Sequence, residues 1–224
     1  ELSSERNGLA SKHPYREAAV AFMKGAEKIA MEEAAHCEGV AIPPSSVRID
    51  YWRRAALSGN VAAMTAYSTG RIFPPRDLLE HLDALKTYKA EAADMADGAA
   101  KSGSPDAVLA LANAHNPNER VAIGTSLLSQ VVESDPKEAL ALYELYRSSL
   151  VDHNPAYAQQ LRRLDAKMAL LEAQMPGSTV TEAKIEAANR RGTWKPLQFA
   201  DDHRVDVPPR TMTRVSPSAF CDAN

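Results

Sequence analysis

Apolar residues recur at steps of three and four residues through most of the chain, which is the spacing of one face of an α-helix. The first such stripe runs from Tyr15 to about Cys37 and ends at Gly39. Further helices are predicted on both sides of the turns at 58–60 and 103–105, over 76–94, over 121–132, from 136 to about 150, from 155 to 176 and over 181–190. The pattern therefore predicts an all-α protein with almost no sheet.

Proline and small polar residues mark where several of these helices begin and end. Pro43-Pro44 followed by Ser45-Ser46 predicts extended backbone and then a serine N-cap. Ser134-Asp135-Pro136 and Asn154-Pro155 predict two more helix starts, and Pro176-Gly177 predicts a stop. The stripe of leucine and methionine over 161–175 either seals the end of the helical array or forms a coiled-coil seam.

Two helical hairpins carry small residues at equivalent offsets on their facing sides. Such residues let two backbones approach closely, so that many dispersion contacts replace the bulk of large side chains. The residues are Trp52, Ala55, Ala56, Gly59, Ala63, Ala66, Tyr67 and Gly70 in the first hairpin, and Ala96, Ala99, Ala100, Gly103, Ala107, Ala110, Leu111 and Ala114 in the second.

Parts of the sequence repeat. The segment Gly39–Pro44 returns as Gly70–Pro75, and Ala55–Gly59 returns as Ala99–Gly103. The first segment returns after 31 residues and the second after 44. Repeats of this length predict stacked helical pairs. The spacing also makes 76–94 an insertion in the second unit, and insertions in repeat arrays often mark the functional face.

The run Tyr51–Met64 resembles the helix-turn-helix core of a Sel-like repeat, a relative of the tetratricopeptide repeats. It has the aromatic pair, the basic residue, the Ala-Ala pair, the glycine turn and the following alanines of that family, and Gly39 and Gly70 match its closing loop. The resemblance covers roughly residues 20 to 115. It implies a short α-solenoid that assembles or regulates other proteins, frequently at bacterial envelopes, with no shared catalytic residues.

The predicted organisation has three parts. Residues 1–14 form a loose N-terminal arm, 15–176 a helical-repeat domain, and 177–224 a short helix followed by an extended, proline-containing tail. We expect Trp194, Leu197 and Phe199 to anchor this tail, with Cys221 as a further candidate. The tail either lies along the scaffold or is disordered.

Composition excludes some classes of function. The 224 residues carry a formal net charge of −3, which provides no electrostatic footprint for nucleic acid. No apolar run approaches the roughly 20 residues that a membrane-spanning helix needs. We therefore expect neither a nucleic-acid partner nor a membrane span, and composition leaves the oligomeric state open.

No pattern for catalysis or cofactor binding is visible. The six histidines are scattered and form no HExxH motif. The acidic cluster at Asp201-Asp202-His203 falls in the proline-containing tail, which is a poor support for a rigid site. We predict a protein that is not an enzyme and has no metal or cofactor.

Whether the two cysteines form a disulfide indicates the cellular compartment of the protein. Cys37 and Cys221 are either a disulfide that clips the tail onto the first repeat or two unrelated thiols. A disulfide indicates a periplasmic or secreted protein whose leader is absent from this sequence, and free thiols indicate a cytoplasmic one.

The leading functional hypothesis is a non-enzymatic scaffold or adaptor that grips a protein or peptide. Exposed positions on the second helix of each hairpin are the predicted contacts: Met64, Thr65, Ser68, Leu109 and Asn113. Two alternatives remain open. One is an inhibitor or immunity-type protein that blocks a secreted effector, and the other is a ligand-binding or enzymatic protein whose pocket the tail closes.

Overall fold

The computed structural model describes Lys28, Met31 and residues 43–74, 78–120, 126–151 and 158–199. The chain divides into two compact units, one of Glu1–Ile42 with Val207–Asn224 and one of Pro43–Asp206. In the first unit only Lys28 and Met31 are described, and both are helical and exposed. Gly39, Cys37, Cys221 and the acidic cluster at 201–203 lie outside the described residues.

Seven α-helices and three short 3₁₀ turns make up the described part of the second unit, which contains no strand. This confirms the predicted all-α class for these residues. None of the described helices is long and apolar enough to cross a membrane. The helices are α3 (Ser45–Leu57), α4 (Val61–Ser68), α5 (Leu82–Lys101), α6 (Pro105–His115), α7 (Pro136–Val151), α8 (Ala158–Ala173) and α9 (Gly177–Thr193), and the 3₁₀ turns are η1 (Leu78–His81), η2 (Pro117–Glu119) and η3 (Leu128–Gln130).

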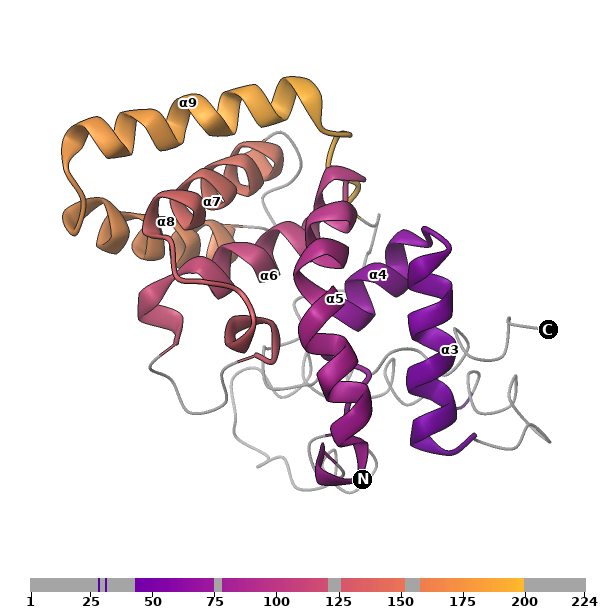
Figure 1. The fold of residues 1–224 in the computed structure, drawn as a ribbon. Helices are drawn as coiled ribbons and strands as arrows, with labels where there is room; N and C mark the ends of the chain where they lie inside the picture. Colours follow the sequence, from indigo (N-terminus) through magenta and orange to yellow (C-terminus); the bar gives the residue numbers. More distant parts are fainter. Residues whose placement is uncertain are drawn as a thin grey trace, which may run out of the picture. The chain divides into compact units, whose positions relative to one another are not determined.

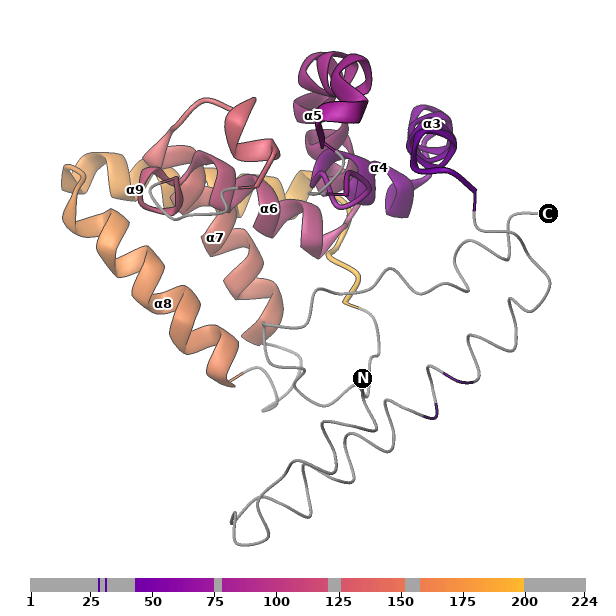
Figure 2. The same cartoon turned by 90° about the horizontal axis from the view of Figure 1, so that it is seen from below.

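Successive helices pack on one another from α3 through α7, and α7 also packs on α8 and α9. Figure 1 shows α3 at one edge of the described helices and α9 lying across the other end. The same order is visible from below in Figure 2, where α3 again lies beside α4 and farthest from α8. Helix α3 therefore has a neighbour on one side only among the described helices.

Both predicted hairpins form with glycine at the turn. Gly59 and Gly103 adopt φ of 87° and 91°, a left-handed conformation that side chains disfavour. Each turn then caps the next helix, because Asn60 Oδ1 accepts from the Ala63 amide and Ser104 Oγ accepts from the Ala107 amide. Pro105 follows as the first residue of α6, where its missing N–H costs nothing.

Small residues line the contacts between these helices, as the sequence predicts. On α5 the side chains of Ala92, Ala96, Ala99 and Ala100 have no exposed area. The facing residues of α4 and α6 are also buried, with Ala63 and Ala107 almost fully covered. Trp52 and Ala55 on α3 are half-buried and pack against the same core.

Residues 194–199 form an extended strap along the turn between α5 and α6. The amides of Lys195 and Gln198 donate to the carbonyls of Lys101 and Gly103, at 3.1 and 2.9 Å. Figure 1 shows this end of the chain descending from α9 beside the top of α5. The predicted anchors are confirmed, because Trp194, Leu197 and Phe199 all pack against the core.

Aromatic and charged contacts fix the two ends of the strap. At its beginning the Arg190 guanidinium lies 5.2 Å from the centre of the Trp194 ring. At its end the Phe199 ring lies 5.6 Å from Tyr146 on α7, edge to face. Arg190 also forms a two-point ion pair with Glu138 on α7, so α9, α7 and the strap form one connected structure.

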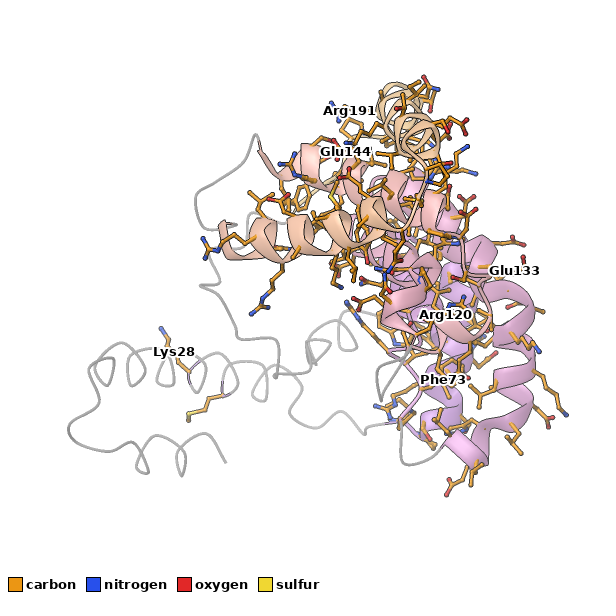
Figure 3. All side chains as sticks on the ribbon, turned by 90° about the vertical axis from the view of Figure 1, so that its left-hand side faces the viewer. Lys28, Phe73, Arg120, Glu133, Glu144 and Arg191 are labelled. Carbon is orange, nitrogen blue, oxygen red and sulfur yellow. The ribbon has the colours of Figure 1, made fainter. Side chains whose placement is uncertain are left out.

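Three predicted features are wrong in detail. The expected helix over 121–132 is absent from its described portion, 126–132, which turns through η3. Arg120, labelled in Figure 3, donates to the carbonyls of Ala114 and Val132 and so ties Val132 to the end of α6. Within the described residues, the stretch predicted as a helix over 76–94 is a 3₁₀ turn at Leu78–His81 and is α-helical from Leu82.

The third prediction that is wrong is the serine N-cap on α3. Pro44 occupies the N-cap position and no side chain caps the helix, while Ser45 lies in the first turn and hydrogen-bonds His81 at 2.9 Å. By contrast, the helix start predicted at Ser134-Asp135-Pro136 is confirmed, because α7 begins at Pro136 and the Asp135 carboxylate accepts from the Lys137 and Glu138 amides. The stripe on α8 serves the core, since Leu164, Met168 and Leu171 are buried.

Candidate interaction surface

None of the predicted contact residues on α4 and α6 is exposed, and two of them, Thr65 and Ser68, are buried inside the helical stack. Thr65 is 7 % exposed and Ser68 is fully buried, so the prediction that these two side chains are exposed is wrong. Thr65 Oγ1 hydrogen-bonds Ser104 Oγ at the next hairpin turn, and the Ser68 carbonyl accepts a 2.6 Å hydrogen bond from Tyr88. The cause is that α4 packs against α3, α5 and α6 and so has no free face at these positions.

The other three predicted contacts are half-buried. Met64 and Leu109 pack against the core. Asn113 is held in a polar cluster, where its Oδ1 accepts from Tyr143 Oη at 2.7 Å and from Lys167 Nζ at 2.9 Å. Lys167 also pairs with Glu119 at 2.9 Å. This cluster ties α6, α7 and α8 together, and the Asn113 amide oxygen is already used within it.

The largest run of exposed apolar side chains on one described helix lies on α3. Val47, Tyr51 and Leu57 are 51 %, 40 % and 57 % exposed. At about 100° per residue, these three and the charged Asp50 and Arg54 fall within about 120° of the helix circumference, so they form one broad side of the helix. We call these five residues the α3 outer face.

Helix α3 is therefore apolar on two sides. Its inner side contributes the buried residues Ile49 and Ala56 to the core, while its outer face carries Val47, Tyr51 and Leu57. A helix at the edge of a domain normally presents a polar face to water. The α3 outer face is therefore the candidate interaction surface among the described helices.

Charged groups border and cross the outer face. Within it, Arg54 pairs with Asp50 one turn earlier, at 3.0 Å, and both side chains are more than half exposed. On the flank toward α5, Arg53 forms a two-point ion pair with Glu91 at 2.5 and 2.8 Å. That pair links α3 to α5 and fixes the orientation of α3 relative to the next hairpin.

Beneath this ion pair lies a cluster of three buried rings, Tyr67, Phe73 and Tyr88, with centres 5.2 to 6.2 Å apart. Phe73 is visible among the helices in Figure 3. Burial, reinforced by the neighbouring Glu91 carboxylate, raises the pKa of Tyr67 from 10.0 to about 12. Burial raises the pKa of Tyr88 further still. Both phenols are therefore held neutral.

We expect the stability of the chain to fall as pH rises from 10 to 12. A folded-state pKa above the unfolded value means that the neutral Tyr67 stabilises the fold fully below pH 10, and that this contribution is lost as the folded phenol ionises near pH 12. The loss due to Tyr67 is on the order of 2 kcal/mol. Urea unfolding at a series of pH values measures it. The variant Tyr67→Phe should show a shallower decline, and an identical decline would contradict this assignment.

Among the described residues, no group of three or more His, Cys, Asp or Glu side chains is arranged to hold a metal ion.

The structural glycines have separate roles. Gly70, with φ of 74°, lies against Leu127, where a Cβ would approach within 2.9 Å. Its predicted repeat partner, Gly39, is outside the described region.

One feature of the sequence indicates the α3 outer face: the adjacent aromatic residues Tyr51 and Trp52, which also match the aromatic pair of a repeat. Of the two, the sequence predicts only Trp52 among the contacts between helices. Only Trp52 turns inward in the structure, where it packs against the core, and Tyr51 is exposed. Successive residues on a helix point about 100° apart, so an aromatic pair at adjacent positions always leaves one ring on a different side.

Comparisons with protein-family models, with curated proteins and with solved structures find no match to this chain.

Proposed function

We propose that the helical unit is a non-enzymatic protein-interaction module, built as a short α-solenoid related to Sel-like repeats, and that it docks a protein partner on the α3 outer face. The observation that supports this function is the exposure of Val47, Tyr51 and Leu57 on an edge helix whose other side is already buried. The successive packing of α3 through α6 and the two glycine-turned hairpins support the solenoid.

The energetics favour a partner over a solvated face. Full burial of a side chain such as Val or Leu contributes about 1.5–3 kcal/mol, and roughly half of that remains to be gained when half of the side chain is exposed. The three apolar residues together therefore offer about 3 kcal/mol to an interface. Arg54 and Asp50 beside them supply direction and specificity, since charges at an interface suppress wrong partners.

The test is a pair of charge substitutions at matched positions. Leu57 on the α3 outer face is 57 % exposed, and Ile185 on α9 is 56 % exposed. Both Leu57→Glu and Ile185→Glu should leave the circular dichroism and the unfolding midpoint within about 0.5 kcal/mol of the starting protein, because both sites are surface positions. We expect Leu57→Glu alone to lose its partners in cross-linking and affinity capture from the native cell.

The control decides the interpretation. Equal recovery of partners by both variants would show that the α3 outer face binds nothing, and loss in both would show that any added carboxylate has the same effect. A tenfold or greater loss confined to Leu57→Glu supports docking at α3, since losing about 1.4 kcal/mol of interface energy reduces affinity tenfold.

A further inference from the structure

The α3 outer face has a pattern of charge and apolar groups that is complementary to itself. Along the helix the order is Val47, Asp50, Tyr51, Arg54 and Leu57. The apolar residues Val47 and Leu57 lie equally far from Trp52, one toward each end, and the acidic Asp50 and basic Arg54 also lie equally far from it. At a rise of about 1.5 Å per residue, the apolar ends are about 15 Å apart and the charges about 6 Å apart.

A twofold axis through the level of Trp52 uses this symmetry. If a second α3 lies antiparallel against the first, Val47 meets Leu57 of the other copy at both ends. Asp50 meets Arg54 of the other copy twice, and the two Tyr51 rings come together near the centre. A contact in which one patch meets itself about a twofold axis is the commonest form of homodimer interface.

We propose that a second copy of this chain binds the α3 outer face, with the two α3 helices antiparallel. This inference rests on the proposed function, because it takes the outer face to be an interaction surface and identifies its occupant. The argument for the second copy is charge complementarity: the Asp50–Arg54 pair within each of the two helices, at 3.0 Å, is exchanged for an Asp50–Arg54 pair between the helices, so two pairs replace two and no charge loses its partner. A parallel arrangement places Asp50 against Asp50 and Arg54 against Arg54.

The interface is small and the dimer is correspondingly weak. A 13-residue helix is about 20 Å long, so the pair covers less than the roughly 800 Å² per partner of a standard interface. We therefore expect a monomer–dimer equilibrium whose midpoint lies between about 10 μM and 1 mM. In sedimentation equilibrium the weight-average mass should rise from 24.3 kDa toward twice that value across this range.

The decisive experiment reverses the two charges one at a time in the full chain. Asp50→Arg leaves two arginines on the face, and Arg54→Asp leaves two aspartates, so each variant alone places like charges across the dimer. We expect each to lower the association constant at least tenfold. An equimolar mixture of the two variants pairs Arg with Asp at every contact and should associate as the starting protein does.

A matched control comes from α5. Asp97 and Lys101 form the same kind of exposed ion pair one turn apart, at 2.5 Å, away from the α3 outer face. Asp97→Arg should associate like the starting protein, and a non-reducing gel of each sample excludes dimers linked through cysteine.

The outcomes separate the two proposals. A starting protein that remains monomeric to about 1 mM, single variants that still associate, or a mixture that is not rescued would each overturn the antiparallel dimer. If the protein stays monomeric while Leu57→Glu still loses its partners and Ile185→Glu retains them, the docking face stands and only its occupant is wrong. If Leu57→Glu and Ile185→Glu recover the same partners, the proposed function itself fails.

Discussion

Gly103→Ala is expected to destabilise the fold by about 3 kcal/mol, whereas Gly59→Ala is expected to cost about 1 kcal/mol. Both glycines sit at hairpin turns with nearly equal left-handed φ, 91° and 87°, so the conformational penalty of about 1–2 kcal/mol is common to both. Their surroundings differ. A Cβ on Gly103 would lie 2.5 Å from the Pro196 carbonyl oxygen, and a Cβ on Gly59 would meet nothing within 4 Å.

The additional cost at Gly103 comes from displacing the strap. The Pro196 oxygen belongs to the backbone, so it moves only if residues 194–199 lift from the α5–α6 turn. That movement breaks the hydrogen bonds from Lys195 and Gln198 and exposes the anchors Trp194, Leu197 and Phe199. Hydrogen bonds contribute about 1 kcal/mol each, and partly buried aromatic anchors contribute at least as much.

Urea unfolding of the two variants against the starting protein measures the difference. Limited proteolysis reports the strap directly, because cleavage after Thr193 should accelerate in Gly103→Ala and stay unchanged in Gly59→Ala. Equal destabilisation by the two substitutions, with no change in cleavage, would mean that the strap does not press on this turn.

The strap also explains why residues far apart in the sequence form one unit. It links the turn of the second hairpin to α7 and α9, because Gln198 bonds to Gly103 while Phe199 packs on Tyr146. The Arg190–Glu138 ion pair joins α9 to α7 at the other end. The helices after residue 176 thus stabilise the hairpins before residue 115, although the two parts share no sequence pattern.

The hairpins were predictable because their signal is local. Glycine at the turn and alanine at steps of three and four act within one or two helices, and Gly59 and Gly103 form the two predicted turns. The caps that Asn60 and Ser104 supply are equally local, although they were not predicted from the sequence. The strap anchors were predictable for a similar reason, since Trp194, Leu197 and Phe199 are the large apolar residues of an otherwise polar segment.

The faces of α4 were mispredicted because burial depends on how many neighbours a helix has. Thr65 and Ser68 are small polar residues, which a helix can present to water or place against a backbone. The missing clue was that 61–69 contains no charged residue, and a helix without a charged face is generally enclosed. The absence of a helix over 126–132 was missed because it accompanies a contact between distant residues, in which Arg120 donates to the carbonyls of Ala114 on α6 and of Val132.

Ala99→Leu is expected to destabilise the fold by about 3 kcal/mol, and Ala90→Leu on the same helix by less than about 0.5 kcal/mol. Ala99 has no exposed area and belongs to the stripe by which α5 meets its neighbours, whereas Ala90 is exposed. Leucine and alanine are both good helix formers, so helix propensity changes little at either site. The difference between the variants therefore isolates the cost of forcing two closely packed helices apart.

The same pair of variants tests whether the small-residue contacts make one continuous interior. If α4, α5 and α6 unfold as a unit, Ala99→Leu should lower the denaturation midpoint without a second transition, and circular dichroism and tryptophan fluorescence should report the same midpoint. Destabilisation of similar size by Ala90→Leu would contradict the close packing at Ala99. A new early transition in Ala99→Leu alone would show that the hairpins are held to α7–α9 less firmly than to each other.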